Sequence, residues 1–84
     1  MNKIHNVQSI TFNQSHLILS VDNKTYYLPL SEISHKLAQA SEKERTAYQI
    51  SPSGYGIHWP LIDEDLSING LIKTAVKLAT SNIN

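Results

Sequence analysis

The stretch HLILSVDNKTYYL, residues 16–28, carries the clearest hairpin pattern in the chain. Residues 16–21 are mostly aliphatic and residues 25–28 are mostly aromatic or β-branched, which is typical of strands. Between them, Asp22-Asn23 tolerates the positive φ angles of a tight hairpin turn. The stretch therefore predicts two antiparallel strands.

Two flanking segments extend this hairpin into a sheet. Residues 7–12 are β-prone, and the turn-forming Asn13-Gln14-Ser15 separates them from the hairpin. Pro29 cannot donate to a sheet ladder, so it ends the third strand or lies on an edge. The first thirty residues predict a three-stranded meander.

Helical signals follow. Ser31 is a suitable N-cap for a helix over residues 32–39, in which apolar residues recur at helical spacing. Ser41 and Glu44 have the spacing of a capping box, which predicts a short helix through Thr46.

A second hairpin is predicted next. Tyr48 and Ile50 share one face of a short strand, and Ile57 and Trp59 share one face of another, with Ser51-Pro52-Ser53-Gly54 as the turn. Trp59 is expected in the core.

The helical pattern from Ser67 onward is the strongest. Its apolar stripe covers about 160° at 100° per residue, and comprises Ile68, Leu71, Ile72, Ala75, Val76, Leu78, Ala79 and Ile83. Asp63, Glu64 and Asp65 precede this helix, where they would favour its dipole and its cap. The predicted fold class is α+β: a small antiparallel sheet, consisting of the meander plus a short hairpin, packed with two to three helices.

Composition limits the classes of function. The chain of 84 residues has room for one domain, and seven Lys and Arg balance seven Asp and Glu. Zero net charge argues against non-specific binding to nucleic acid or anionic lipid. There is no cysteine, no signal-peptide pattern and no apolar run of membrane-spanning length, so we expect a cytoplasmic protein.

One motif resembles a known family. Residues 56–72 read Gly56-Ile57-His58-Trp59-Pro60-Leu61-Ile62-Asp63-Glu64-Asp65-Leu66-Ser67-Ile68-Asn69-Gly70-Leu71-Ile72. This stretch is similar to the signature of the domain-of-unknown-function family 2442, which consists of small bacterial proteins. The resemblance covers about residues 7–72 of a single domain spanning residues 1–84, and leaves residues 73–84 as a helical extension.

The resemblance implies an α+β fold, and it implies a function through the genes that lie beside those of relatives. Relatives often sit beside a second small gene in arrangements like toxin–antitoxin pairs, and some carry a helix-turn-helix domain. We therefore expect a non-enzymatic, antitoxin-like interaction module whose partner is encoded by a neighbouring gene. The alternatives are a nucleic-acid-binding regulator and a small accessory inhibitor of phage or plasmid type.

Catalysis and metal binding are the less favoured interpretations. His58 beside Asp63, Glu64 and Asp65 could act as a base with carboxylate partners, but the carboxylates serve equally well at a helix start. The four histidines include no i, i+4 pair, and the acidic run lacks a calcium-loop pattern. We expect no enzyme activity, no cofactor and no metal.

Other motifs also have structural explanations. Residues 51–56 lack the lysine of a phosphate-binding loop, and are better explained as a hairpin turn. Basic residues Lys36, Lys43 and Arg45 alternate with glutamates, which favours a solvated face over a nucleic-acid surface.

A partner-binding surface is assigned to two groups of side chains. The predicted residues are Tyr55, His58, Asp63, Glu64 and Asp65, together with Val76, Leu78, Ala79 and Ile83 of the last helix. The helical group would also suit a homodimer, because its apolar stripe is longer than one small sheet can cover.

Overall fold

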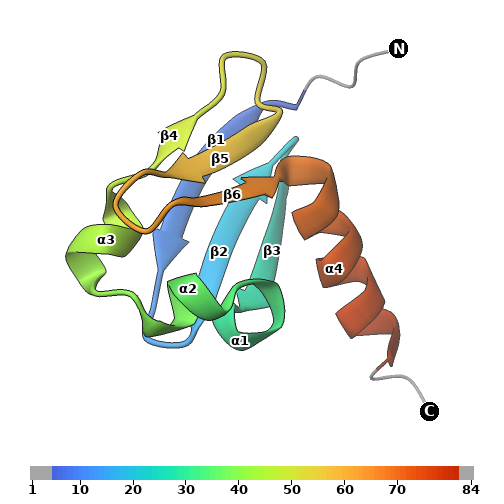
Figure 1. The fold of residues 1–84 in the computed structure, drawn as a ribbon. Coiled ribbons are helices and arrows are strands. Elements are labelled where there is room, and N and C mark those ends of the chain that lie inside the picture. Colours follow the sequence, from blue (N-terminus) through green and yellow to red (C-terminus); the bar gives the residue numbers. More distant parts are fainter. Residues whose placement is uncertain (1–4, 82–84) are drawn as a thin grey trace.

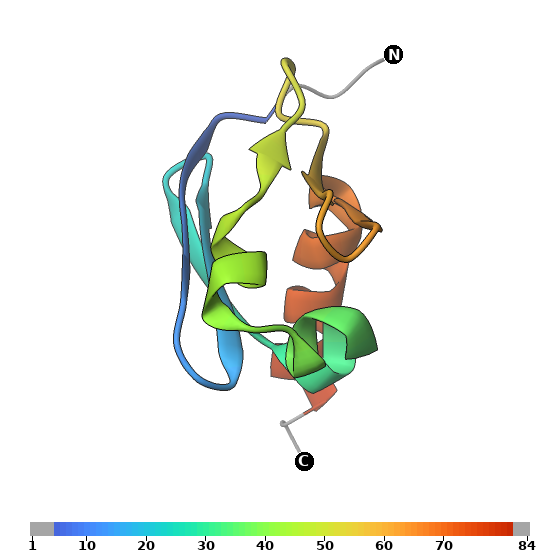
Figure 2. The same ribbon diagram turned by 60° about the vertical axis from the view of Figure 1, so that its left-hand side comes forward.

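The computed structural model describes residues 5–81, which fold into two layers (Figures 1 and 2). One layer is the meander of β1 (Val7–Phe12), β2 (His16–Val21) and β3 (Lys24–Pro29). The other contains a second sheet of β4 (Gln49–Ile50), β5 (Gly56–Trp59) and β6 (Glu64–Ser67), with helices α1 (Leu30–Ile33), α2 (His35–Gln39), α3 (Glu42–Thr46) and α4 (Ile68–Ser81). The predicted α+β class is confirmed. None of the helices in the described part is long and apolar enough to cross a membrane.

The meander matches the sequence prediction. Asp22 and Asn23 adopt φ angles of 52° and 67°, as a tight hairpin turn between β2 and β3 requires. Alternate residues of β2, namely Leu17, Leu19 and Val21, are buried against the second layer. A register shift between Val7 and Ser9 in β1 lets residues on both sides of it face the core.

The predicted helix over residues 32–39 with a Ser31 cap is wrong. The chain forms α1 and α2 instead, and Ser34 between them is extended, with φ −167° and ψ 117°. The Ser34 hydroxyl accepts from the Leu37 amide at 3.1 Å and donates to Glu64 Oε2 at 2.5 Å. Ser34 is therefore the cap of α2, and its bond to a carboxylate of β6 favours the break at this serine.

The capping box of α3 is confirmed. Ser41 and Glu44 exchange the two predicted backbone bonds, at 3.2 and 2.8 Å. The helix runs through Thr46, as its pattern indicates.

The acidic run before α4 does not start a helix, which corrects a second prediction. Glu64 and Asp65 belong to β6, which pairs with β5 so that Trp59 lies opposite Glu64. Asp63, with φ 52°, lies in the turn between the two strands. Pairing with β5 satisfies the backbone of this segment, and Ser67, whose hydroxyl accepts from the Gly70 amide at 2.9 Å, caps α4 instead.

The core lies between the layers. Trp59 is fully buried, and its indole Nε1 donates to the Arg45 carbonyl at 2.9 Å. From α4, Ile68 and Leu71 join the core, whereas Val76 is 53% exposed. The predicted apolar stripe therefore packs at its N-terminal half, and Ile83 lies outside the described residues.

His5 links three parts of the fold that are distant from one another along the chain. The buried His5 ring contacts Asp22 Oδ2 through Nδ1 and Asn69 Oδ1 through Nε2, both at 2.8 Å. Gly54, with φ 65°, lies against the His5 carbonyl, where a Cβ atom would come within 2.1 Å of the oxygen. His5 thereby connects the β2–β3 turn, the β4–β5 turn and α4.

Candidate functional site

In residues 5–81, the outer edge of β1 pairs with no other strand. The Asn13 amide donates to the His16 carbonyl at 3.1 Å, so this pair is hydrogen-bonded within the antiparallel ladder. Because such pairs alternate, Thr11 bonds to β2 while Ile10 and Phe12 direct their N–H and C=O groups away from it. Among the described residues, the hydrogen bond identified at this edge comes from Tyr48 Oη to the Ile10 carbonyl, at 3.3 Å.

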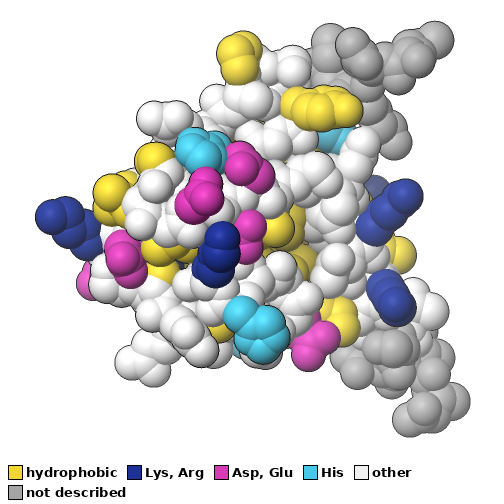
Figure 3. Space-filling model, in the orientation of Figure 1, with side chains coloured by type: hydrophobic (Ala, Val, Ile, Leu, Met, Phe, Trp, Pro, Cys, Tyr) yellow, Lys and Arg dark blue, Asp and Glu magenta, His cyan; other side chains and the backbone are white. Residues whose placement is uncertain are grey.

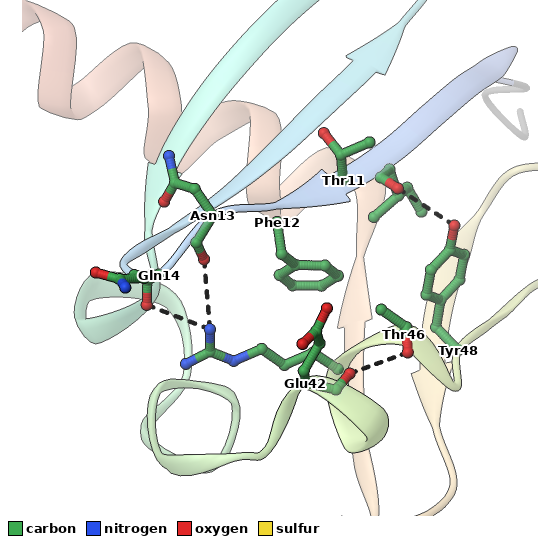
Figure 4. Close-up of a pocket in the computed structure, with 9 residues that line it drawn as sticks. Thr11, Phe12, Asn13, Gln14, Glu42, Thr46 and Tyr48 are labelled. Atoms are coloured by element: carbon green, nitrogen blue, oxygen red, sulfur yellow. Dashed lines mark hydrogen bonds between the residues drawn. The ribbon is translucent and has the colours of Figure 1, made fainter.

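A groove of about 520 Å³ runs along this edge (Figure 4). One wall is β1 with its following turn, and the other is α3 with the segment after it. The lining residues are Ile10, Thr11, Phe12, Asn13, Gln14, Glu42, Arg45, Thr46 and Tyr48. We call this the β1 groove.

Arg45 holds the two walls together. Its Nη1 donates to the carbonyls of Gln14 at 3.2 Å and Asn13 at 3.4 Å, in the turn after β1. Its Nε and Nη2 donate to the Leu37 and Ala38 carbonyls at the end of α2, at 3.0 and 3.1 Å. The guanidinium is thus occupied by main-chain acceptors, and its role in the groove is to fix the distance between the walls.

Glu42 is different, because its carboxylate has no hydrogen-bond or salt-bridge partner among the described residues. The side chain is exposed, and Figure 4 shows its carboxylate pointing toward the ring of the half-buried Phe12. The β1 groove therefore combines an apolar floor, an anionic acceptor and free backbone groups.

No pattern in the sequence indicates this groove. Glu42 and Arg45 alternate with charges of opposite sign, a pattern that predicts a solvated charged face. The walls come from segments about thirty residues apart, and only the tertiary contacts bring them together. The unpaired edge of β1 could have been suspected from its place at the start of a meander.

The predicted acidic and histidine residues lie elsewhere, on the surface formed by β5, β6 and the turn between them (Figure 3). His58 Nδ1 contacts Asp65 Oδ1 at 2.8 Å, with the two side chains 40% and 74% exposed. Glu64 turns toward Ser34, and the Asp63 carbonyl accepts from Lys36 Nζ at 2.9 Å.

The structure thus separates the predicted cluster. It pairs His58 with Asp65 and directs Glu64 into the fold. No group of three His, Asp or Glu residues in the described chain is arranged to hold a metal ion. An exposed contact of this kind between a histidine and a carboxylate contributes about 0–1 kcal/mol to stability.

The remaining predicted partner-binding residues are scattered. Tyr55 is 58% exposed in the loop before β5. On α4, Val76 and Ala79 are exposed, whereas Leu78 is half-buried and lines a hollow of about 510 Å³ against Tyr27, Pro29 and Glu32.

Comparison with known proteins places the groove within a shared fold. The family model described as a protein of unknown function (DUF2442) matches residues 7–77, which include both walls of the groove and run further into α4 than the predicted end at residue 72. The crystal structure of a protein of unknown function from Rhodospirillum rubrum ATCC 11170, at 2.75 Å resolution, aligns with a TM-score of 0.67 and 28% identity over 86% of this chain and 88% of that one. No curated protein sequence matches the chain.

Proposed function

Because this chain belongs to the DUF2442 family of proteins of unknown function, we propose that it is a non-enzymatic module that binds a partner protein. In this proposal the partner is encoded by a neighbouring gene, and the pair resembles an antitoxin with its cognate protein. The observation that carries the proposal is the β1 groove, where a strand edge and the Glu42 carboxylate, neither with a partner among the described residues, lie beside a half-buried phenylalanine.

The arrangement of the other polar residues supports binding over catalysis. A general base needs a reacting group within hydrogen-bonding reach and an enclosed site. His58 and Asp65 lie on an open surface, whereas the β1 groove holds an arginine that is already occupied by carbonyls. The exposed groups of the β1 groove are therefore suited to binding a partner.

Co-expression with the product of the adjacent gene, followed by size-exclusion chromatography, tests this function. We expect the two proteins to elute as one complex of defined stoichiometry. Two separately eluting proteins would contradict the proposal. A complex that forms equally well with an unrelated control protein would contradict it too.

Homodimerisation through α4 stays a prediction. It depends on the exposed Val76 and Ala79, because the neighbouring Leu78 already packs partly against the body of the protein. Light scattering on the full chain should show a dimer that Val76→Glu converts to a monomer. A full chain that is monomeric at every concentration tested would show this prediction to be wrong.

A further inference from the structure

We infer that the β1 groove takes an extended segment of the partner, which adds a strand to β1 and places a Lys or Arg side chain on Glu42. The inference rests on the proposed function in one respect, namely that the ligand is a protein. It goes beyond that function by specifying the backbone conformation of the ligand and the chemistry of one of its side chains.

The backbone part of the inference comes from the register. Ile10 and Phe12 each direct an N–H and a C=O away from β2. Ile10 is only 7% exposed and its carbonyl already accepts from Tyr48, with one lone pair left, so the half-buried Phe12 offers the more accessible donor and acceptor. A polypeptide in β conformation matches this spacing of donors and acceptors. Strand addition to an exposed edge is a recurring mode of peptide recognition, in which the main chain supplies affinity.

Side-chain requirements follow from strand geometry. On an added strand, the residue opposite Phe12 lies about 4.5–5.5 Å from it on the same face of the sheet. That face opens into the β1 groove, whose floor there is the Phe12 ring. An apolar side chain fits this position, and the next side chain on the same face comes two residues along the ligand.

The charge of that second side chain is set by the groove. Arg45 is occupied by four carbonyl oxygens, so it has little capacity left for a ligand carboxylate. Glu42 is the charged lining residue whose side chain lacks a partner in the described part of the chain. An ammonium or guanidinium group complements it through a charge-assisted hydrogen bond. The expected ligand pattern is an apolar residue and a Lys or Arg separated by one residue, in an order that depends on the direction of the added strand.

A displayed library of random linear peptides, selected on the full-length protein, tests this pattern. Selected peptides should share an apolar and a basic residue separated by one position, in one of the two orders, and their binding should slow hydrogen exchange of the Ile10 and Phe12 amides. Glu42→Lys should weaken binding by about tenfold or more, because it replaces an attraction by a repulsion.

Glu32→Lys is the matched control. Glu32 is also an exposed glutamate in the first turn of a short helix, but it does not line the β1 groove. Peptide binding should be unchanged in this variant. Thermal unfolding of both variants should establish that each is folded before binding is compared.

Three results would overturn the inference: no enriched peptides, peptides bound equally by the Glu42→Lys and Glu32→Lys variants, or edge amides that become protected by self-association of the full chain. The co-expression test separates this failure from failure of the function. A complex with the neighbouring gene product that is insensitive to Glu42→Lys would retain the proposed function and reject the groove. If Glu42→Lys abolishes binding of the selected peptides but the neighbouring gene product forms no complex with the protein, the groove is retained and the proposed partner is rejected.

Discussion

Two neighbouring residues of β5, His58 and Trp59, have opposite environments because successive side chains of a strand point to opposite faces. Trp59 is fully buried and its indole nitrogen reaches the Arg45 carbonyl, whereas His58 pairs with Asp65 at the surface. Strand β5 therefore carries the buried Trp59 directly beside His58, which forms an exposed pair with Asp65.

Trp59→Ala should lower the free energy of unfolding by about 3–5 kcal/mol, because it removes a large buried side chain and leaves a cavity. His58→Ala, the matched neighbour, should cost less than about 1 kcal/mol. Urea unfolding followed by far-UV circular dichroism checks both, since Trp59 is the sole tryptophan and fluorescence is lost with it. A stable Trp59→Ala variant that has lost only partner binding would instead make Trp59 an interface residue.

At the scale of elements, the two serines around α1 have different roles. Ser34 caps α2 and donates to Glu64, whereas Ser31 is an exposed residue within α1, and Pro29 holds the N-cap position of that helix. A hydroxyl stabilises a helix start only where the backbone around it is extended and the amides point toward it.

Ser34→Ala should therefore destabilise the protein by about 1–3 kcal/mol, since the variant loses a helix cap and leaves the half-buried Glu64 carboxylate without this donor. Ser31→Ala should stay within about 0.5 kcal/mol of the wild type. Chemical denaturation of both variants decides. An effect at Ser31 as large as that at Ser34 would contradict the assignment of the helix cap to Ser34 and favour the predicted cap at Ser31.

The edge of β1 gives a second prediction at this scale. In the free protein, the amides of Ile10 and Phe12 should exchange with solvent about tenfold or more faster than those of Ser9 and Thr11, which bond to β2. Hydrogen exchange followed by NMR resolves the four amides. Equal protection along the strand would mean that the edge is already covered, or that the register differs.

For the whole molecule, Arg45 is the residue that connects the two layers near the groove. Its side chain binds the turn after β1 and the end of α2, while its carbonyl receives the indole of Trp59. The zero net charge of the chain does not reveal this role, because the charge of Arg45 takes part in hydrogen bonds within the protein.

Arg45→Met should cost about 2–4 kcal/mol, because four carbonyls lose a charged donor while the aliphatic packing is largely kept. Arg45→Lys should not restore the loss, because an ammonium cannot span acceptors on two segments as the planar guanidinium does. Lys43→Met, in the same helix, is the control and should change stability by less than about 0.5 kcal/mol. Thermal unfolding of the three variants measures these differences, and full rescue by lysine would contradict the role given to Arg45.

Local sequence was sufficient for elements whose stabilising contacts lie close along the chain. The Asp22-Asn23 turn and the Ser41 capping box each depend on residues within about one turn of one another, so their patterns predicted them correctly. The helical spacing after Ser67 also predicted α4, although not the residue that caps it. Alternation along β5 likewise placed Trp59 inside.

Tertiary structure decided the features whose partners are distant. The break at Ser34 depends on Glu64, thirty residues away, and the acidic run became β6 because β5 was available to pair with it. The β1 groove exists only where the edge of the first strand meets α3. Local patterns report which backbone states a segment prefers. Hydrogen bonds and packing between remote segments select among those states, because each such contact contributes as much free energy as the local preferences that it overrides.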